Sequence, residues 1–188
     1  MYQTLLADSS LYVFLFQLDE DIAADCRRGG CPCSGSLHSA KYPRKPRGLP
    51  PGLEDKYDSR FSFCCNREGC RRRSTPASFR FLGRKVFVAA VVVLVSALRH
   101  GATPKRAAML REFVGVSRRT VERWREWWQD GFVRSPFWKA VRGRLKTPVD
   151  REALPLSLLN AFSGQEEKDR LISLLRLLLP LTKPMQDF

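Results

Sequence analysis

The six cysteines of this chain all lie between residues 26 and 70, and this confinement constrains the fold more than any other feature of its 188 residues. They form two groups, CRRGGCPCSGSLH from Cys26 and CCNREGC from Cys64. A structural zinc site takes four thiolate or imidazole ligands at tetrahedral corners, and two turns carrying two cysteines each can supply them. Glycines and prolines interrupt any helix over residues 26–75. The pattern predicts a small β-rich, zinc-ribbon-like module, with short strands around residues 37–42 and 60–65.

The cysteine spacing leaves the choice of ligands partly open. The commonest knuckle is C-x2-C, whereas the first pair here, C-P-C, is one residue shorter and the second, C-N-R-E-G-C, is wider. The cysteines expected to hold one structural Zn²⁺ per chain are Cys31, Cys33, Cys65 and Cys70. The substitutes are Cys26, His38 and Cys64. The alternative is a set of ordinary thiols without a metal.

The sequence around the cysteines lacks the residues that catalysis requires. A catalytic zinc needs an open coordination site and a nearby general base, and no H-x-E motif accompanies the cysteines. A cysteine nucleophile needs a histidine partner, and the chain has two histidines, His38 and His100. We therefore expect a closed structural site and no enzymatic activity.

Residues 107–128, AAMLREFVGVSRRTVERWREWW, have the pattern of a helix-turn-helix, in which two helices meet at a short turn that often contains glycine. Gly115 is expected to end the first helix, and Ser117 to cap the second. Val116 and Val121 are placed to pack together across this cap as a hydrophobic staple. The second helix is expected to cover residues 117–131 and to end at Gly131.

The second helix has an apolar and a charged face. Val121, Trp124 and Trp128 recur at helical spacing and are expected to pack on the preceding helices. In DNA-binding helix-turn-helix proteins the N-terminal part of this helix enters the major groove, where arginine makes bidentate contacts with guanine. The base readers would be Arg118, Arg119 and Arg123. The full set expected to face DNA, with Thr120 and Arg125 at phosphates, is Arg118, Arg119, Thr120, Glu122, Arg123 and Arg125. The alternative is a core helix with a solvated charged face.

An excess of positive charge also indicates an anionic partner. The chain has 33 Lys and Arg against 19 Asp and Glu, a net charge of +14. Such a surplus is usually compensated by nucleic acid or an anionic membrane, and its concentration in a few segments favours nucleic acid. The further residues expected to contact DNA are Arg44, Lys45, Arg47, Arg71, Arg72 and Arg73. The first three lie in a proline-rich segment, 42–52, that could instead be a solvated loop.

The remaining segments carry weaker signals. Residues 11–18 resemble a strand, residues 81–101 a long buried helix, and residues 135–145 a further helix. The apolar run 86–98, about 13 residues, is short of the roughly 20 that span a membrane. The leucine-dense helix expected over 168–181 could pack on the core or form a homodimer. We expect no membrane association and no secretory signal, and hence a cytoplasmic, nucleoid-associated protein whose cysteines bind metal rather than form disulfides.

Two stretches carry a family resemblance. GVSRRTVERWREWW resembles the helix-turn-helix of transposase-like and mobile-element proteins. CPCSGSLHSAKYPRKPRG with RFSFCCNREGCRRRSTPASFRFLGR resembles bacterial zinc-ribbon proteins that carry such a motif, although their first knuckle usually reads C-P-x-C-G-G. The resemblance implies DNA binding near mobile elements, with other mobile-element proteins as partners. A full transposase would add a large catalytic domain with an acidic triad, so the implied role is accessory or regulatory.

These features together predict an α+β chain in which a small β-rich zinc-ribbon-like module precedes an all-α helix-turn-helix domain and a helical tail. The expected function is site-specific binding of double-stranded DNA. The alternative is RNA binding, or a zinc-mediated protein adaptor without DNA sequence specificity. The expected domains are a lead with a short strand (1–25), the zinc-ribbon-like module (26–75), the helix-turn-helix domain (76–146) and the leucine-rich tail (147–188).

Overall fold

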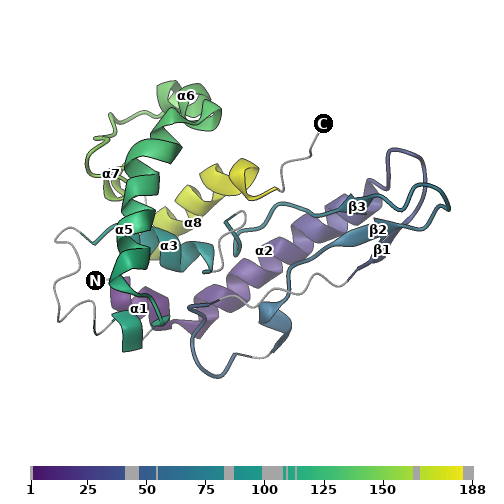
Figure 1. The fold of residues 1–188 in the computed structure, drawn as a ribbon, viewed down its shortest axis with the longest axis horizontal. Helices are drawn as coiled ribbons and strands as arrows, with labels where there is room; N and C mark the ends of the chain where they lie inside the picture. The colour runs from purple at the N-terminus through teal and green to yellow at the C-terminus, as the bar shows by residue number, and fades with distance from the viewer. Residues whose placement is uncertain are drawn as a thin grey trace. The chain divides into compact units, whose positions relative to one another are not determined.

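A computed structural model describes residues 2–40, 47–53, 55–82, 87–98, 108, 110–112, 114–162 and 166–183. The chain forms two compact units, each treated by itself below. We call Asp8–Val88 with Leu178–Phe188 the cysteine unit, and Met1–Ala7 with Ala89–Leu177 the helical unit. The class is α+β, with many helices and one small antiparallel sheet (Figure 1). The expected lead and tail are each divided between the two units.

The cysteine unit begins with α2, Ser9–Arg28, where the sequence had predicted a strand over 11–18. That prediction is wrong. Aromatic and β-branched residues favour strands, but Asp8 caps a helix here by accepting a hydrogen bond from the Ser10 amide at 2.9 Å. The buried residues of α2 recur at helical spacing and form one stripe: Leu11, Tyr12, Leu15, Phe16, Asp19 and Ala23.

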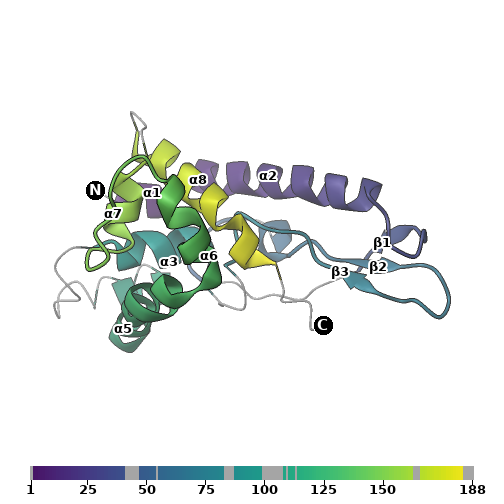
Figure 2. The same cartoon turned by 90° about the horizontal axis from the view of Figure 1, so that it is seen from above.

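A three-stranded antiparallel sheet follows α2, in the order β1-β2-β3. The strands are β1 (Leu37–Ser39), β2 (Phe63–Cys65) and β3 (Arg73–Ser74), and a 3₁₀ helix, η1 (Asp55–Asp58), precedes β2. Leu37 lies opposite Cys65, and Phe63 lies opposite Ser74. The predicted strands at 37–42 and 60–65 are therefore confirmed as short segments. Figures 1 and 2 show the sheet beside the C-terminal end of α2.

A buried ion pair joins α2 to the segment that follows the sheet. Asp19 and Arg80 are each 1% exposed, and Arg80 Nε lies 2.8 Å from Asp19 Oδ2. The Ser78 hydroxyl and the Phe79 amide also donate to this carboxylate, each at 2.6 Å. Burial raises the pKa of Asp19, and the Arg80 guanidinium opposes that rise. Loss of either partner would leave the other charge buried and unpaired.

The end of the described chain returns to the same segment. The Thr182 carbonyl accepts a hydrogen bond from Arg60 Nη2 at 2.5 Å, and Thr182 Oγ1 accepts one from the Ser78 amide at 2.9 Å. All three side chains are buried. These bonds explain why Leu178–Phe188 belongs to the cysteine unit rather than to the leucine-rich helix before it.

The helical unit has α3, Ala89–Ser96, at its centre, and all eight of its residues are buried. This confirms a buried helix, although one shorter than the expected 81–101. Before α3, Phe81 forms an antiparallel bridge with Val88, and Phe87 a parallel one with Arg47, so these residues are extended rather than helical. Besides α3, the unit contains α1 (Tyr2–Ala7), α5 (Arg118–Glu126), η2 (Trp127–Phe132), α6 (Pro136–Val141), η3 (Arg142–Arg144), α7 (Leu156–Asn160) and most of α8 (Glu167–Leu178).

The predicted end of the second helix at Gly131 is wrong. The helix continues from α5 into the π-helical segment η2, and Gly131 lies inside it. A Cβ at Gly131 would lie 3.0 Å from Trp127 Cδ1, so this glycine provides room for the indole instead of ending the helix. The further helix expected over 135–145 is present as α6, which Ser135 caps by accepting a hydrogen bond from the Trp138 amide at 3.1 Å.

The leucine-dense segment forms α8, followed by the 3₁₀ helix η4 (Leu179–Thr182). Four leucines of its stripe are buried within the chain: Leu171, Leu174, Leu175 and Leu178. This burial agrees with packing on the core, the first of the two interpretations of the stripe. Among the helices that the described residues form, none has both the length and the apolar character needed to cross a bilayer.

Candidate metal centre and candidate nucleic-acid interface

Four cysteine sulfurs come together in the cysteine unit, all within 4.8 Å of one another: those of Cys31, Cys33, Cys65 and Cys70. These are the four predicted ligands. The Sγ atoms of Cys31 and Cys70 are 3.7 Å apart, and those of Cys33 and Cys65 are 3.4 Å apart. A Zn–S bond of about 2.3 Å places the sulfurs of a regular tetrahedron about 3.8 Å apart. The thiols therefore have the number and spacing that a tetrahedral metal ion requires.

Two tight turns present these thiols. In the first, the Cys31 amide donates to the Gly35 carbonyl at 3.0 Å, and Ser34 has a positive φ of 66°. A Cβ at Gly35 would lie only 2.6 Å from Cys65 Sγ, so glycine is required there by space. In the second turn the Arg67 amide donates to Cys65 Sγ at 3.4 Å. Both turns therefore bring backbone atoms close to Cys65 Sγ, one of the four clustered sulfurs.

The turns also favour the thiolate form of one ligand. The backbone amide of Gly35, with the thiols of Cys70 and Cys65, lowers the pKa of Cys33 to about 6. The Arg67 amide acts in the same direction on Cys65, but burial and the neighbouring thiols outweigh it and raise the pKa of Cys65 to about 12. Thiolates are the metal-binding form of cysteine. Cys33 is therefore ready to bind at neutral pH, and a cation would have to displace protons from Cys31 and Cys65, whose pKa values are raised.

The three substitute ligands lie outside the cluster. Cys26 Sγ is 3.3 Å from the Ser74 hydroxyl. His38 is exposed on β1, and its strand partner Cys64 has its thiol 3.4 Å from the Arg71 carbonyl. Cys26 packs against the apolar cluster of Ala23, Leu37 and Phe63 beside the turns. The short C-P-C pair therefore does provide two of the four clustered sulfurs.

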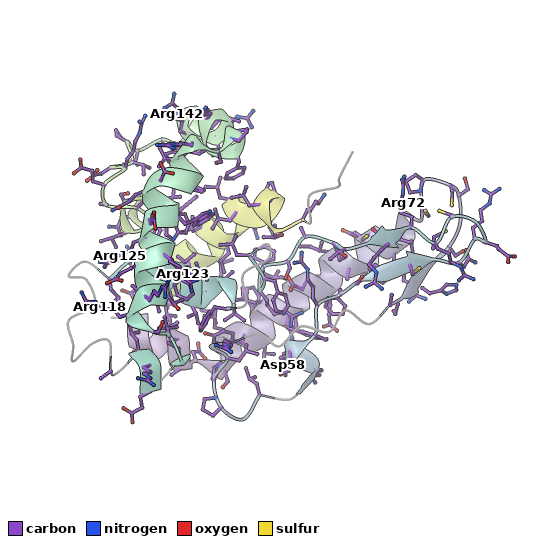
Figure 3. All side chains as sticks on the ribbon, in the orientation of Figure 1. Asp58, Arg72, Arg118, Arg123, Arg125 and Arg142 are labelled. Carbon is purple, nitrogen blue, oxygen red and sulfur yellow. The ribbon has the colours of Figure 1, made fainter. Side chains whose placement is uncertain are left out.

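Exposed arginines surround this centre. Arg71 and Arg72 are exposed between Cys70 and β3, and Arg73 is exposed as the first residue of β3. Figure 3 shows Arg72 beside β3. Sequence reasoning missed Arg67, whose Nη1 donates to the Cys33 carbonyl at 2.6 Å and so connects the two turns. Its place inside the C-N-R-E-G-C knuckle was the available signal.

The helical unit contains the two local features that the sequence predicts at Gly115 and Ser117. Residues 108, 110–112 and 114 are helical. Gly115 then has a φ of +66° and its amide bonds the Arg111 carbonyl at 3.1 Å, which is the left-handed C-terminal cap that glycine favours. Ser117 caps α5 by accepting a hydrogen bond from the Thr120 amide at 3.3 Å. The signals at Gly115 and Ser117 are therefore both confirmed.

Along α5 and η2, apolar residues are buried on one side of the helix and arginines are exposed on the other, as the sequence spacing predicts. Val121 is 3% exposed, Trp124 6% and Trp128 0%, and Val116 before the cap is fully buried. Arg119 and Arg123 are exposed on the other side. Arg118 is exposed as well and pairs with Glu122 at 2.8 Å. Figure 3 shows Arg118, Arg123 and Arg125 along α5.

Two residues that were expected at DNA phosphates have partners within the chain. Thr120 is 9% exposed and its hydroxyl lies 2.9 Å from that of Ser117, so it belongs to the helix cap. Arg125 is half-buried and donates to the Leu98 carbonyl, which ties α5 to the end of α3. Arg47 is exposed, and its carbonyl accepts from the Val88 amide. Arg44 and Lys45 lie outside the described residues.

Comparisons of this chain with protein-family models, with curated proteins and with solved structures found no match. Two arrangements within the chain bear on its function: four clustered thiols in the cysteine unit, and a capped helix with exposed arginines in the helical unit.

Proposed function

We propose that this protein binds double-stranded DNA at specific sites through α5, and that a structural zinc stabilises its cysteine unit. The observation that carries the proposal is the outer face of α5, which begins directly after the capped turn at Gly115 and Ser117. A helix in this position inserts its first turns into the major groove in helix-turn-helix proteins. Arg119 and Arg123 are the proposed base readers, because an arginine fork matches the O6 and N7 acceptors of guanine.

Arg118 and Glu122 have a supporting role in this proposal. Their exposed ion pair holds the Arg118 side chain along the helix, and such exposed pairs contribute little stability. Arg118 can therefore exchange Glu122 for a base or a phosphate without destabilising the fold. Arg125 and Thr120 are not among the proposed contacts, because Arg125 is half-buried against the Leu98 carbonyl and Thr120 is buried in the helix cap.

The test is binding to duplexes that differ at one base pair. Replacement of Arg119 or Arg123 by Ala should weaken binding to the preferred duplex by about 1–3 kcal/mol and relax the preference at one base position. Arg176→Ala is the matched control, since Arg176 is an exposed arginine on α8 of the same unit. An equal loss on every duplex would indicate phosphate contact only. Unchanged binding by both variants would refute the assignment to α5.

The metal part of the proposal assigns Zn²⁺ to Cys31, Cys33, Cys65 and Cys70. Four thiolates at tetrahedral spacing suit zinc or an iron–sulfur centre, and a zinc with four protein ligands has no open position for catalysis. Elemental analysis of the purified protein should find one zinc per chain. Cys65→Ser should lose it, whereas Cys64→Ser, the neighbouring cysteine outside the cluster, should retain it. A metal-free protein of unchanged stability would refute this part.

The resemblance to mobile-element proteins suggests an accessory role, such as recognition of element ends. RNA binding and a zinc-mediated adaptor function remain the competing classes. A protein that prefers RNA to every duplex, or that binds neither, would favour one of them.

A further inference from the structure

A cavity of about 300 Å³ opens on the helical unit where η3 leads into the segment before α7. Its lining comes from one stretch of chain and includes Trp138, Arg142, Lys146, Thr147 and Arg151. Figure 3 shows Arg142 just after α6, beyond the C-terminal end of α5. None of these residues takes part in the proposed base reading. The cavity is therefore separate from the charged face of α5.

The lining is strongly cationic. Three of its side chains, Arg142, Lys146 and Arg151, are positively charged and exposed, and the described lining contains no carboxylate. Asp150 and Glu152, the acids on either side of Arg151, line a different cavity together with Arg125. In the described part of the chain, no ion pair neutralises the three cations. Like charges gathered in one concavity attract an anion and repel each other without one.

A buried donor accompanies these charges. Trp138 is 2% exposed, and its indole Nε1 has no hydrogen-bond partner among the described residues. A buried N–H without an acceptor destabilises the fold, so such a group calls for an explanation. Trp138 lines the cavity, but its Nε1 lies behind the cavity surface, so the indole serves as a reporter at the cavity wall. The groups that can meet a ligand are the three cations and the Thr147 hydroxyl, and they suit a ligand that accepts many hydrogen bonds.

We infer that this cavity binds a phosphate group. Arginine forks match phosphate oxygens in a bidentate manner, and lysine adds a point charge. A space of about 300 Å³ lies at the small end of ligand sites, which is room for one phosphate with part of the group that bears it. The phosphate has two sources: a backbone phosphodiester of bound DNA, which rests on the proposed function, or a free phosphate or phosphomonoester, which does not.

The phosphate site itself is tested without DNA. In ¹H–¹⁵N NMR spectra of the full chain, the indole signal of Trp138, assigned with Trp138→Phe, should shift and saturate as inorganic phosphate is added. Chloride at equal ionic strength is the reference. The double variant Arg142→Gln with Lys146→Gln should lose the shift, whereas Lys139→Gln should keep it, because Lys139 is exposed on α6 outside the lining. A response no larger than that to chloride, or one that persists in the double variant, overturns the inference.

The source of the phosphate is tested on an unselected duplex. If a backbone phosphate occupies the cavity, the double variant should lower the slope of log K against log salt by about 0.9, the value for one lost phosphate contact on duplex DNA. Lys139→Gln should leave the slope unchanged. A phosphate-dependent Trp138 shift with an unchanged slope assigns the cavity to free phosphate or a phosphomonoester. If the unaltered protein binds no duplex, the proposed function fails while the NMR titration still decides the phosphate site.

Discussion

Gly35 offers a sharp test of the metal centre, because it has no side chain and the neighbouring Cys65 sulfur occupies the space where one would lie. A Cβ added by Gly35→Ala would lie 2.6 Å from Cys65 Sγ, 3.1 Å from Arg67 Cβ and 3.2 Å from Asn66 Oδ1. Favourable contacts of carbon lie at about 3.5–4.0 Å. The Cys65 sulfur would therefore have to move by about 1 Å, and metal–ligand distances tolerate only about 0.2 Å.

The magnitude follows from the loss of one ligand. Structural zinc binds with about 10–16 kcal/mol, which is about 3 kcal/mol for each of four ligands. Loss of that share corresponds to an affinity about 100-fold lower, at 1.4 kcal/mol for each factor of ten. The chelator concentration needed to remove zinc should therefore be about 100-fold lower for Gly35→Ala than for the unaltered protein.

The assay is competition for zinc with a coloured chelator, followed by elemental analysis of the protein after dialysis. Gly29→Ala is the matched control. Gly29 has an ordinary φ of −63°, and its added Cβ would meet carbonyl oxygens at 3.6 Å, which is normal contact. Equal zinc retention by both variants would refute the claim that Cys65 binds the metal in the geometry described here.

Three further substitutions test the packing. Asp19→Asn should lower the free energy of unfolding in urea by about 3 kcal/mol, because it leaves a buried guanidinium unpaired; the exposed Asp21→Asn should change it by less than about 0.5 kcal/mol, and equal effects would contradict the buried pair. Thr182→Val removes the acceptor of the Ser78 amide, so hydrogen exchange at that amide should accelerate and stability fall by about 1–3 kcal/mol; an unchanged exchange rate would exclude this bond. Ser117→Ala should cost about 1 kcal/mol through the lost helix cap, and an unaltered urea midpoint would mean that Ser117 is not the cap.

Local signals account for the parts of this fold that could be predicted. A left-handed glycine and an N-cap serine are properties of a few neighbouring residues, and both were found at Gly115 and Ser117. The cysteine cluster could also be predicted, because each pair of cysteines lies in one short turn. The unusual C-P-C spacing, however, left open which residues bind the metal. Ser34 and Gly35 explain how that pair still forms a turn, through a positive φ at one residue and the missing Cβ at the next.

Long-range contacts account for most of the rest. Residues 11–18 look like a strand by composition, yet Asp8 caps a helix there, and Phe16 on its buried stripe packs against the rings of Tyr57 and Phe61. Asp19 lies in the acidic stretch LDEDIAAD, and its partner Arg80 follows it by about sixty positions, too distant for any local pattern to reveal. Arg125 was expected at DNA for its charge alone, whereas the Leu98 carbonyl binds it. In each case a contact distant in sequence overrode the local preference.

Selection of bound sites from a random duplex library at physiological salt would reveal whether α5 reads a DNA sequence. We expect an enriched motif for the unaltered protein, and one that becomes degenerate at a single position when the selection is repeated with Arg119→Ala. A selected pool no different from the starting library would refute sequence-specific binding through α5.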